Sequence, residues 1–194
     1  MANIDLLKQL REETGISVSE CKKALEEAAG DIKRAKEILR ERGKEIMKGK
    51  ATRAVSKGLI EVYLHPGSKV GVLLELSCES DFVAKGEDFK KLAHEICLQI
   101  AATKPMFIRA EDIPQETIDE EKKIYQKQAQ ALGKPANFTE QIVSGKLKKY
   151  KDEVSLLSQP WVKDVSKTIQ DLIADYVARL GERVEVKRFT RYEI

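Results

Sequence analysis

One short stretch of this chain places a hydroxyl, an acid and a large aromatic side chain next to one another. The stretch is Glu79-Ser80-Asp81-Phe82-Val83, at the junction between a predicted strand and a predicted helix. Two interpretations fit these residue types. In the first, Asp81 caps the helix and Phe82 belongs to the core. In the second, the pair is presented as an apolar wedge with a charge at its tip. The residues alone leave both interpretations open.

The residue types that carry out covalent chemistry elsewhere do not form a catalytic arrangement here. Neither His65 nor His94 has a serine or cysteine motif beside it that would supply a nucleophile. Acidic residues mostly lie beside lysines, as in residues 116–121, which is typical of solvated helix faces. The glycines are scattered singly, so no phosphate-binding loop is predicted. We therefore expect a protein that acts by binding, with no catalytic residue, metal site or cofactor.

The cysteines indicate buried thiols in a reducing compartment. Cys21, Cys78 and Cys97 are odd in number and far apart, so neither a disulfide framework nor a metal cluster is predicted. Each lies in a patterned segment, which favours burial. The N-terminus lacks the features of a signal peptide, and no apolar run is long enough to cross a membrane. We expect a cytoplasmic protein.

Length and charge limit the function classes further. The chain has 194 residues, of which 42% are hydrophobic and 35% charged, so it can bury a core of one or two domains. Its net charge is only +3, from 35 basic and 32 acidic residues. Proteins that track phosphates usually carry a clear basic excess, so nucleic acid is not expected as the main partner.

The N-terminal part predicts three short helices. Helices of about ten residues are unstable alone, so they must share a small core. Ser17 and Glu20 form a predicted capping box for the second helix, and Asp31 is expected to cap the third. Gly43 is expected to end the third helix. The basic segment 44–57 follows, and a linker is favoured there over a nucleic-acid arm because it carries no aromatic side chain for stacking.

From Gly58 onward the hydrophobic period changes to two. Alternating runs predict a hairpin of two strands and a third strand near the C-terminus, at residues 59–64, 70–78 and 184–192. Helices are predicted at residues 89–102, 115–132, 138–153 and 166–180, with a turn at 133–135 and an apolar loop at 156–164. This pattern predicts an α+β fold. A three-helix module with the start of the linker spans residues 1–52, and a core with a three-stranded antiparallel sheet and packed helices spans 53–194.

Four segments resemble motifs of the short form of bacterial elongation factor Ts, in the family's order. The family's motifs are an N-terminal signature, a Thr-Asp-Phe-Val motif, a Gln-Pro-Phe-Val segment and a C-terminal strand. The matching residues here are 10–25, 80–83, 157–164 and 188–193. The resemblance implies a ubiquitin-associated-like N-terminal module. It also implies guanine nucleotide exchange on elongation factor Tu, the GTPase that delivers aminoacyl-tRNA in translation elongation. Longer members carry a second core half and a helical hairpin, and neither is expected in this shorter chain.

The resemblance also assigns roles to particular residues. Ser80 stands where the family usually has threonine and keeps its hydroxyl. Phe82 would insert between helices of the partner's GTPase domain, and Asp81 would disturb the water ligands of the partner's Mg²⁺, with Val83 completing the motif. Two further positions match partner contacts of the family, Lys22 and Val162. The simpler alternative for Lys22 is a solvated lysine.

The missing second core half implies a homodimer, in which two sheet-bearing cores supply what longer members carry in one chain. The complex would then contain two copies of this chain and two of elongation factor Tu, without a membrane and without strong direct nucleic-acid binding. The alternative function is a small RNA- or ribosome-binding module that uses the basic segment 44–57 and the N-terminal helices. Weak net charge and the absence of interleaved aromatics argue against that alternative.

Overall fold

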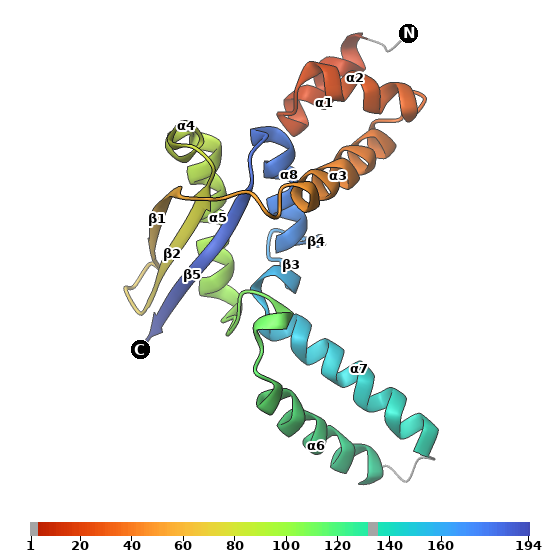
Figure 1. Ribbon diagram of the computed structural model, residues 1–194, viewed down its shortest axis with the longest axis vertical. Helices are drawn as coiled ribbons and strands as arrows, with labels where there is room; N and C mark the ends of the chain where they lie inside the picture. The colour runs from red at the N-terminus through yellow and green to blue at the C-terminus, as the bar shows by residue number, and fades with distance from the viewer. Residues whose placement is uncertain (1–3, 132–135) are drawn as a thin grey trace. The chain divides into compact units, whose positions relative to one another are not determined.

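The computed structural model describes residues 4–131 and 136–194, and the chain separates into two units (Figure 1). The first unit contains Met1–Ala101 and Gln170–Ile194, and the second contains Ala102–Ile169. The turn predicted at 133–135 lies outside the described residues. The division of the chain at residue 52 stays a prediction.

The N-terminal helices are α1 (Ile4–Thr14), α2 (Val18–Glu27) and α3 (Ile32–Gly49). They share a small core, as predicted, whose fully buried members include Leu10, Cys21, Ala24 and Ala35. The predicted caps are confirmed in the backbone. The Glu20 N–H donates to Ser17 Oγ at 3.3 Å, and the Arg34 N–H donates to Asp31 Oδ1 at 3.1 Å.

Helix α3 continues six residues past Gly43, so the prediction that Gly43 ends it was wrong. Gly43 is buried, and a Cβ placed on it would lie 2.7 Å from the carbonyl oxygen of Ala174 in α8 (Ile169–Leu180). The glycine therefore permits close approach of two helices and does not act as a stop. Beyond it, Lys44 Nζ pairs with Asp171 Oδ1 of α8 at 2.5 Å.

The described residues form the predicted three-stranded antiparallel sheet, in the order β1-β2-β5. Its strands are β1 (Lys57–Leu64), β2 (Val70–Cys78) and β5 (Val184–Glu193), and a bulge interrupts the β2–β5 ladder after Glu75. Figure 1 shows α5 (Glu87–Thr103) lying along one face of the sheet. That face carries the buried side chains of the central strand, Val72, Leu74 and Leu76.

The second unit contains two long helices, α6 (Gln115–Ala131) and α7 (Ala136–Val154), which run antiparallel to each other (Figure 1). Lys146 of α7 donates to Gln128 Oε1 at 2.6 Å, and its ammonium lies 5.5 Å from the centre of the Tyr125 ring. Both helices were predicted. The expectation that a helical hairpin is missing was wrong, because these helices form one.

The segment predicted as an apolar loop at 156–164 contains a turn of 3-10 helix, η2 (Leu156–Ser158), and a short hairpin. The hairpin consists of β3 (Pro160–Trp161) and β4 (Asp164–Thr168), and α8 starts three residues later than predicted. Another 3-10 turn, η1 (Ala110–Asp112), precedes α6. None of the helices in the described parts of the chain has both the length and the apolar character that crossing a bilayer requires.

Candidate functional site

The motif at residues 80–83 forms the start of a short helix, α4 (Asp81–Lys85), between β2 and α5. Ser80 is its N-cap, and the Val83 N–H donates to Ser80 Oγ at 3.3 Å. Val83 and Ala84 are each only 6% exposed, so they attach the helix to the core. At the other end the Gly86 N–H donates to the Val83 carbonyl at 2.9 Å. Helix α4 is therefore a single turn held at both ends and on one side.

Phe82 lies on the opposite side of this turn and is 88% exposed. The interpretation of Phe82 as a core residue is therefore wrong for this structure. Asp81 occupies the first turn while Ser80 acts as the cap, so the capping interpretation of Asp81 is also wrong. Asp81 Oδ2 lies 3.2 Å from Lys57 Nζ of β1, and both side chains are largely exposed. An apolar ring and an acid thus stand side by side on the surface.

A distant carboxylate holds the cap of α4. Glu182 follows α8 in the chain, and its Oε2 accepts the N–H groups of Glu79 at 3.2 Å and Ser80 at 3.0 Å. Its Oε1 accepts the Ser80 hydroxyl at 2.6 Å. The Ser80 hydroxyl therefore donates to Glu182 and accepts from Val83 at the same time.

Glu79 makes the reverse contact. Its Oε1 accepts the N–H of Arg183 at 2.6 Å, and its Oε2 lies 3.2 Å from the guanidinium of Arg53. The hydrogen bond from the Arg183 backbone, followed by the Arg53 pair, lowers the pKa of Glu79 below its ordinary value. Directly before it, the Cys78 thiol is buried and donates to the Ser80 carbonyl at 3.2 Å. Burial is the main cause of a raised pKa at Cys78, and the nearby Glu182 adds to it.

Sequence reasoning did not find Glu182 or Arg183, and it assigned no contact with this motif to Glu79 or Lys57. These residues read as ordinary charged positions at the ends of strands and helices. The one available signal was the position of Glu182 and Arg183 in the chain. They lie between Gly181, which ends a helix, and β5, which pairs with β2. That pairing brings their loop to the end of β2, where α4 begins.

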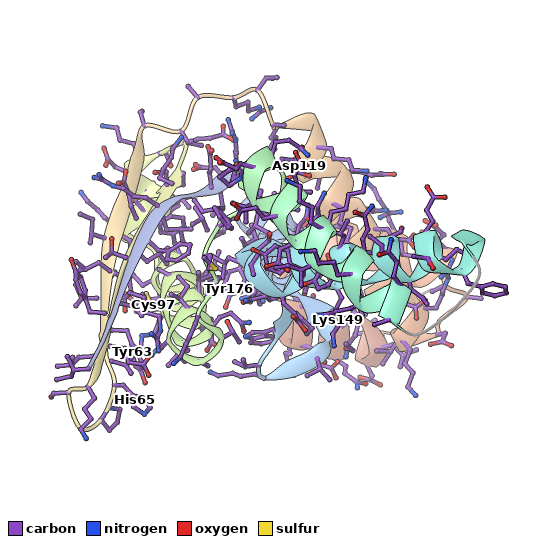
Figure 2. All side chains as sticks on the ribbon, turned by 90° about the horizontal axis from the view of Figure 1, so that it is seen from below. Tyr63, His65, Cys97, Asp119, Lys149 and Tyr176 are labelled. Carbon is purple, nitrogen blue, oxygen red and sulfur yellow. The ribbon has the colours of Figure 1, made fainter. Side chains whose placement is uncertain are left out.

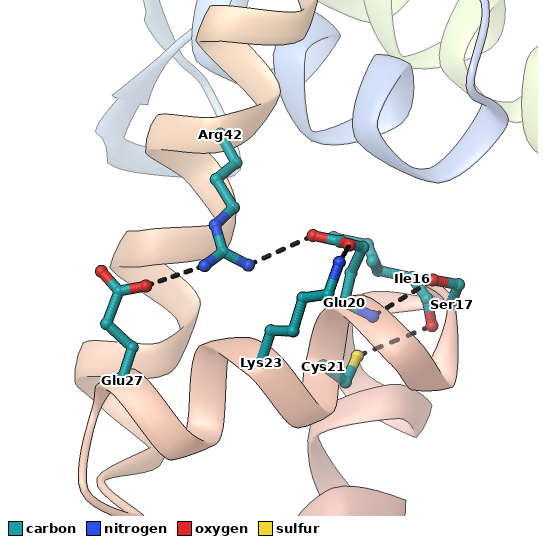
Figure 3. Close-up of polar contacts among 7 residues, drawn as sticks. All are labelled: Ile16, Ser17, Glu20, Cys21, Lys23, Glu27 and Arg42. Atoms are coloured by element: carbon teal, nitrogen blue, oxygen red, sulfur yellow. Dashed lines mark hydrogen bonds and ion pairs between the residues drawn. The ribbon is translucent and has the colours of Figure 1, made fainter.

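Lys22 lies on α2, where its side chain is 59% exposed and its Nζ is 3.9 Å from Glu26 Oε1. The helix that carries it is braced from α3. Figure 3 shows the Arg42 guanidinium between two carboxylates of α2, at 3.1 Å from Glu20 and 2.7 Å from Glu27. Glu20 also binds Lys23, so its carboxylate faces these cations instead of completing the predicted capping box. Lys22 is thus available on a fixed helix.

Val162 belongs to the second unit, in the turn between β3 and β4, and is 43% exposed. The buried amide of Gln159 fixes the start of this hairpin. Gln159 Oε1 accepts the Thr103 hydroxyl at 2.6 Å, and its Nε2 donates to the Glu153 carbonyl at 2.7 Å. A largely buried polar group that is satisfied in this way holds the local backbone in one arrangement.

The histidines lie around Tyr63 on the sheet. Tyr63 and His65 meet at the end of the β1–β2 hairpin, with 2.9 Å between the phenol oxygen and the His65 Nδ1 (Figure 2). His94 Nδ1 lies 3.1 Å from Glu61 Oε1, and its ring packs edge-on against Tyr63. Among the residues that the structure describes, no three potential metal-ligating side chains are grouped so as to hold an ion. Cys97 is buried, and burial raises the pKa of its thiol to about 12.

The fold and this site define a class: an α+β protein that carries a helical module and presents an exposed aromatic–acid pair on a braced turn. The family model described as "Elongation factor TS" matches residues 5–194, so the chain belongs to the elongation factor Ts family. Members of this family are elongation factors of protein biosynthesis.

Curated relatives agree over nearly the whole chain. Elongation factor Ts of Coprothermobacter proteolyticus is 51% identical over 189 residues, which cover 97% of this chain and 96% of the relative. The proteins of the same name from Thermotoga maritima and Carboxydothermus hydrogenoformans are 47% and 46% identical. These alignments cover 99% and 100% of this chain, and 96% and 89% of the respective relatives.

Proposed function

We propose that this chain is a cytoplasmic guanine nucleotide exchange factor for elongation factor Tu, and that it promotes GDP release by disturbing the Mg²⁺ and phosphate site of that partner. The observation that carries the proposal is the exposure of Phe82: its side chain is 88% exposed, on a turn that is anchored by the buried residues Val83 and Ala84. A large apolar side chain held out from a fixed backbone is suited to enter a pocket of another protein. Membership of the elongation factor Ts family supports the choice of partner.

Exchange of this kind needs no covalent step. The factor must bind the nucleotide-free partner more tightly than the GDP-bound partner, and by linkage GDP and the factor then weaken each other equally. A thousandfold weakening of GDP binding corresponds to about 4 kcal/mol of coupling free energy. The chain therefore has to supply contacts that form only when the nucleotide site is distorted.

Phe82 is the main candidate for such a contact. Moving a phenylalanine ring from water into an apolar pocket contributes roughly 1.5–3 kcal/mol. Most of that area is available, because the ring is exposed in the free chain. Its turn is already capped and anchored, so little ordering remains to be done on binding.

Asp81 supplies the charge beside the wedge. A carboxylate brought close to a bound Mg²⁺ competes with the water and phosphate oxygens that the ion prefers. In the free chain Asp81 pairs with Lys57, but exposed pairs of this kind contribute only about 0–1 kcal/mol. Asp81 can therefore exchange Lys57 for partner groups at small cost. Lys22 on α2 and Val162 in the β3–β4 turn are proposed as additional contacts with elongation factor Tu.

Release of fluorescent GDP from elongation factor Tu tests the Mg²⁺ part of this proposal. Wild type should accelerate release, and Asp81→Asn should accelerate it less when Mg²⁺ is present. With Mg²⁺ chelated, the two proteins should become equal, because no ion remains to be displaced. Failure of wild type to accelerate release would overturn the exchange function. A deficit of Asp81→Asn that persists without Mg²⁺ would overturn only the role of the acid.

The contacts of the basic segment support exchange over an RNA- or ribosome-binding function. Several cations of segment 44–57 are paired within the protein: Lys44 with Asp171, Arg53 with Glu79 and Lys57 with Asp81. Lys50 donates to the Gly181 carbonyl. Cations that already have anionic or carbonyl partners release fewer counterions from phosphates. Filter binding with tRNA and ribosomal RNA should accordingly detect no strong specific complex.

We further propose that the chain is a homodimer that binds two copies of elongation factor Tu. The support is an exposed apolar surface on the side of the sheet away from α5, which we call the outer sheet face. It comprises Ile60, Val62, Leu64, Leu73 and Tyr192, each between 45% and 68% exposed. The strand registers place Val62 beside Leu73 and Leu64 in the same row as Tyr192, so the patch is continuous. A continuous patch of this kind marks an interaction surface, and a second copy can cover it symmetrically.

A further inference from the structure

We propose that Glu182 is a positioning residue for the wedge: its carboxylate sets the orientation of the α4 turn and thereby of Phe82. The effect on GDP release rests on the proposed exchange function. The role of Glu182 in orienting α4 rests only on the contacts within the chain. Nothing in the motif at residues 80–83 points to Glu182, which lies 102 residues further along the chain than Ser80.

The Glu182 carboxylate receives several hydrogen-bond donors at once. Two backbone N–H groups and one hydroxyl converge on it, at 3.2, 3.0 and 2.6 Å. These donors come from Glu79 and Ser80, the two residues immediately before α4. Hydrogen bonds to a charged acceptor are about twice as strong as neutral ones, and three of them fix the acceptor and the donors in one geometry.

Helix α4 cannot set its own orientation. It has only five residues, far fewer than an isolated helix needs for stability in water. Its direction is therefore decided by what holds its ends and by its buried residues Val83 and Ala84. At the N-terminal end that support is the Ser80 hydroxyl, which is itself held by Glu182.

The contact between the loop that enters α4 and the loop that leaves α8 is reciprocal. Glu182 binds the backbone at Glu79 and Ser80, while Glu79 binds the backbone N–H of Arg183 at 2.6 Å. The two loops, one entering α4 and one leaving α8, are thus fastened by two carboxylates in opposite directions. The wedge is tied in this way to α8 and β5 as well as to β2.

Loss of the Glu182 carboxylate would leave the Glu79 and Ser80 N–H groups without this acceptor. The Ser80 hydroxyl could still accept from Val83, so α4 would form but with more freedom. Phe82 would then have to be ordered during binding, which weakens productive docking. We expect Glu182→Ala to raise the concentration of factor needed for half-maximal GDP release, with a loss of about tenfold in kcat/KM.

The test is a double-mutant cycle of Glu182→Ala with Phe82→Ala, read by release of fluorescent GDP from elongation factor Tu. If Glu182 acts through the wedge, the tenfold loss disappears in the Phe82→Ala background, because no ring remains to be oriented. Asp119→Ala is the control, since Asp119 is an exposed carboxylate on α6 that accepts one hydrogen bond from Gln115. It should exchange like wild type.

A merely structural role gives a different result. It would lower the melting temperature and reduce exchange by the same factor in both backgrounds, which would overturn the inference. Amide hydrogen exchange of the free protein is the second readout: Glu182→Ala should selectively speed exchange at Glu79 and Ser80, and unchanged protection there would also overturn it. If Glu182→Ala does not fold, Glu182→Gln enters the same cycle, and a smaller loss that again vanishes with Phe82→Ala is expected.

The failure of this inference is distinguishable from failure of the proposed function. If wild type does not accelerate GDP release, the exchange function fails, while the hydrogen-exchange comparison still decides whether Glu182 holds the turn. If wild type is active, Phe82→Ala is impaired and Glu182→Ala equals wild type, only the positioning role of Glu182 fails.

Discussion

At the scale of single residues, the Ser80 hydroxyl connects two levels of the structure. As an acceptor it caps a local helix, and as a donor it binds a carboxylate from the far end of the chain. Serine and threonine both carry the required hydroxyl, so the threonine of the family motif that this segment resembles would be able to make both bonds. One of the carboxylates beside this cap, Glu79, leads to a testable prediction about the pH dependence of stability.

Glu79 should make the stability of the protein depend on pH in a defined window. Its hydrogen bond from the Arg183 backbone and its pair with Arg53 lower its pKa in the folded state below the ordinary 4.5. A lowered folded pKa means that the stabilisation is present above about pH 4.5 and is lost as the pH falls further. Urea unfolding should therefore show wild type more stable than Glu79→Gln at pH 7, with the difference shrinking as the pH falls below about 4.5. A difference that stays constant down to pH 3 would contradict this.

The buried thiols should react slowly in the native protein. Burial raises the pKa of Cys97 to about 12 and also raises the pKa of Cys78, so neither is a thiolate near neutral pH. We expect a thiol reagent such as dithionitrobenzoate to label the native chain far more slowly than the urea-unfolded chain at pH 8. Rapid labelling of these two cysteines in the native state, located by peptide mapping, would argue against this packing.

At the scale of elements, two glycines inside helices have different structural roles. Gly43 lies inside α3 against the backbone of α8. Gly145 lies inside α7, where no atom of the described residues comes within 4 Å of the place of its missing Cβ. Gly43→Ala should lower the free energy of unfolding by about 1–3 kcal/mol through overpacking. Gly145→Ala should raise it by about 0.5–1 kcal/mol through helix propensity. Thermal or urea unfolding checks both, and a stabilising Gly43→Ala would contradict the close packing.

Local signals made most elements predictable, and long-range contacts account for what was missed. Ser17 and Asp31 cap their helices through residues three positions away, and alternation along 70–78 indicated a strand, so both could be found in the sequence. The extension of α3 depends on packing against α8, which has no local signature. The exposure of Phe82 likewise depends on which side of α4 meets the core. Glu182 was missed because strand pairing, not sequence proximity, brings it to Ser80.

At the scale of the whole molecule, the outer sheet face should decide the oligomeric state. Val62 is 64% exposed and lies beside Leu73 in the middle of the patch. Val62→Asp places a charge in the proposed interface, where burial without a partner is costly, so it should convert a dimer into a monomer. Val165→Asp is a matched control, because Val165 is 80% exposed on β4, which belongs to the separate two-stranded sheet β3-β4. Multi-angle light scattering at micromolar concentration measures both, and a monomeric wild type would contradict the proposal.

The central claim is that an exposed ring on a braced turn drives nucleotide release from elongation factor Tu. The most direct measurement compares wild type, Phe82→Ala and Phe138→Ala in the release of fluorescent GDP. Phe138 is a suitable control because it is also an exposed phenylalanine, at 53%, but lies on α7. We predict that Phe138→Ala accelerates release like wild type, while Phe82→Ala loses at least tenfold in kcat/KM. Equal acceleration by Phe82→Ala and wild type would contradict the claim.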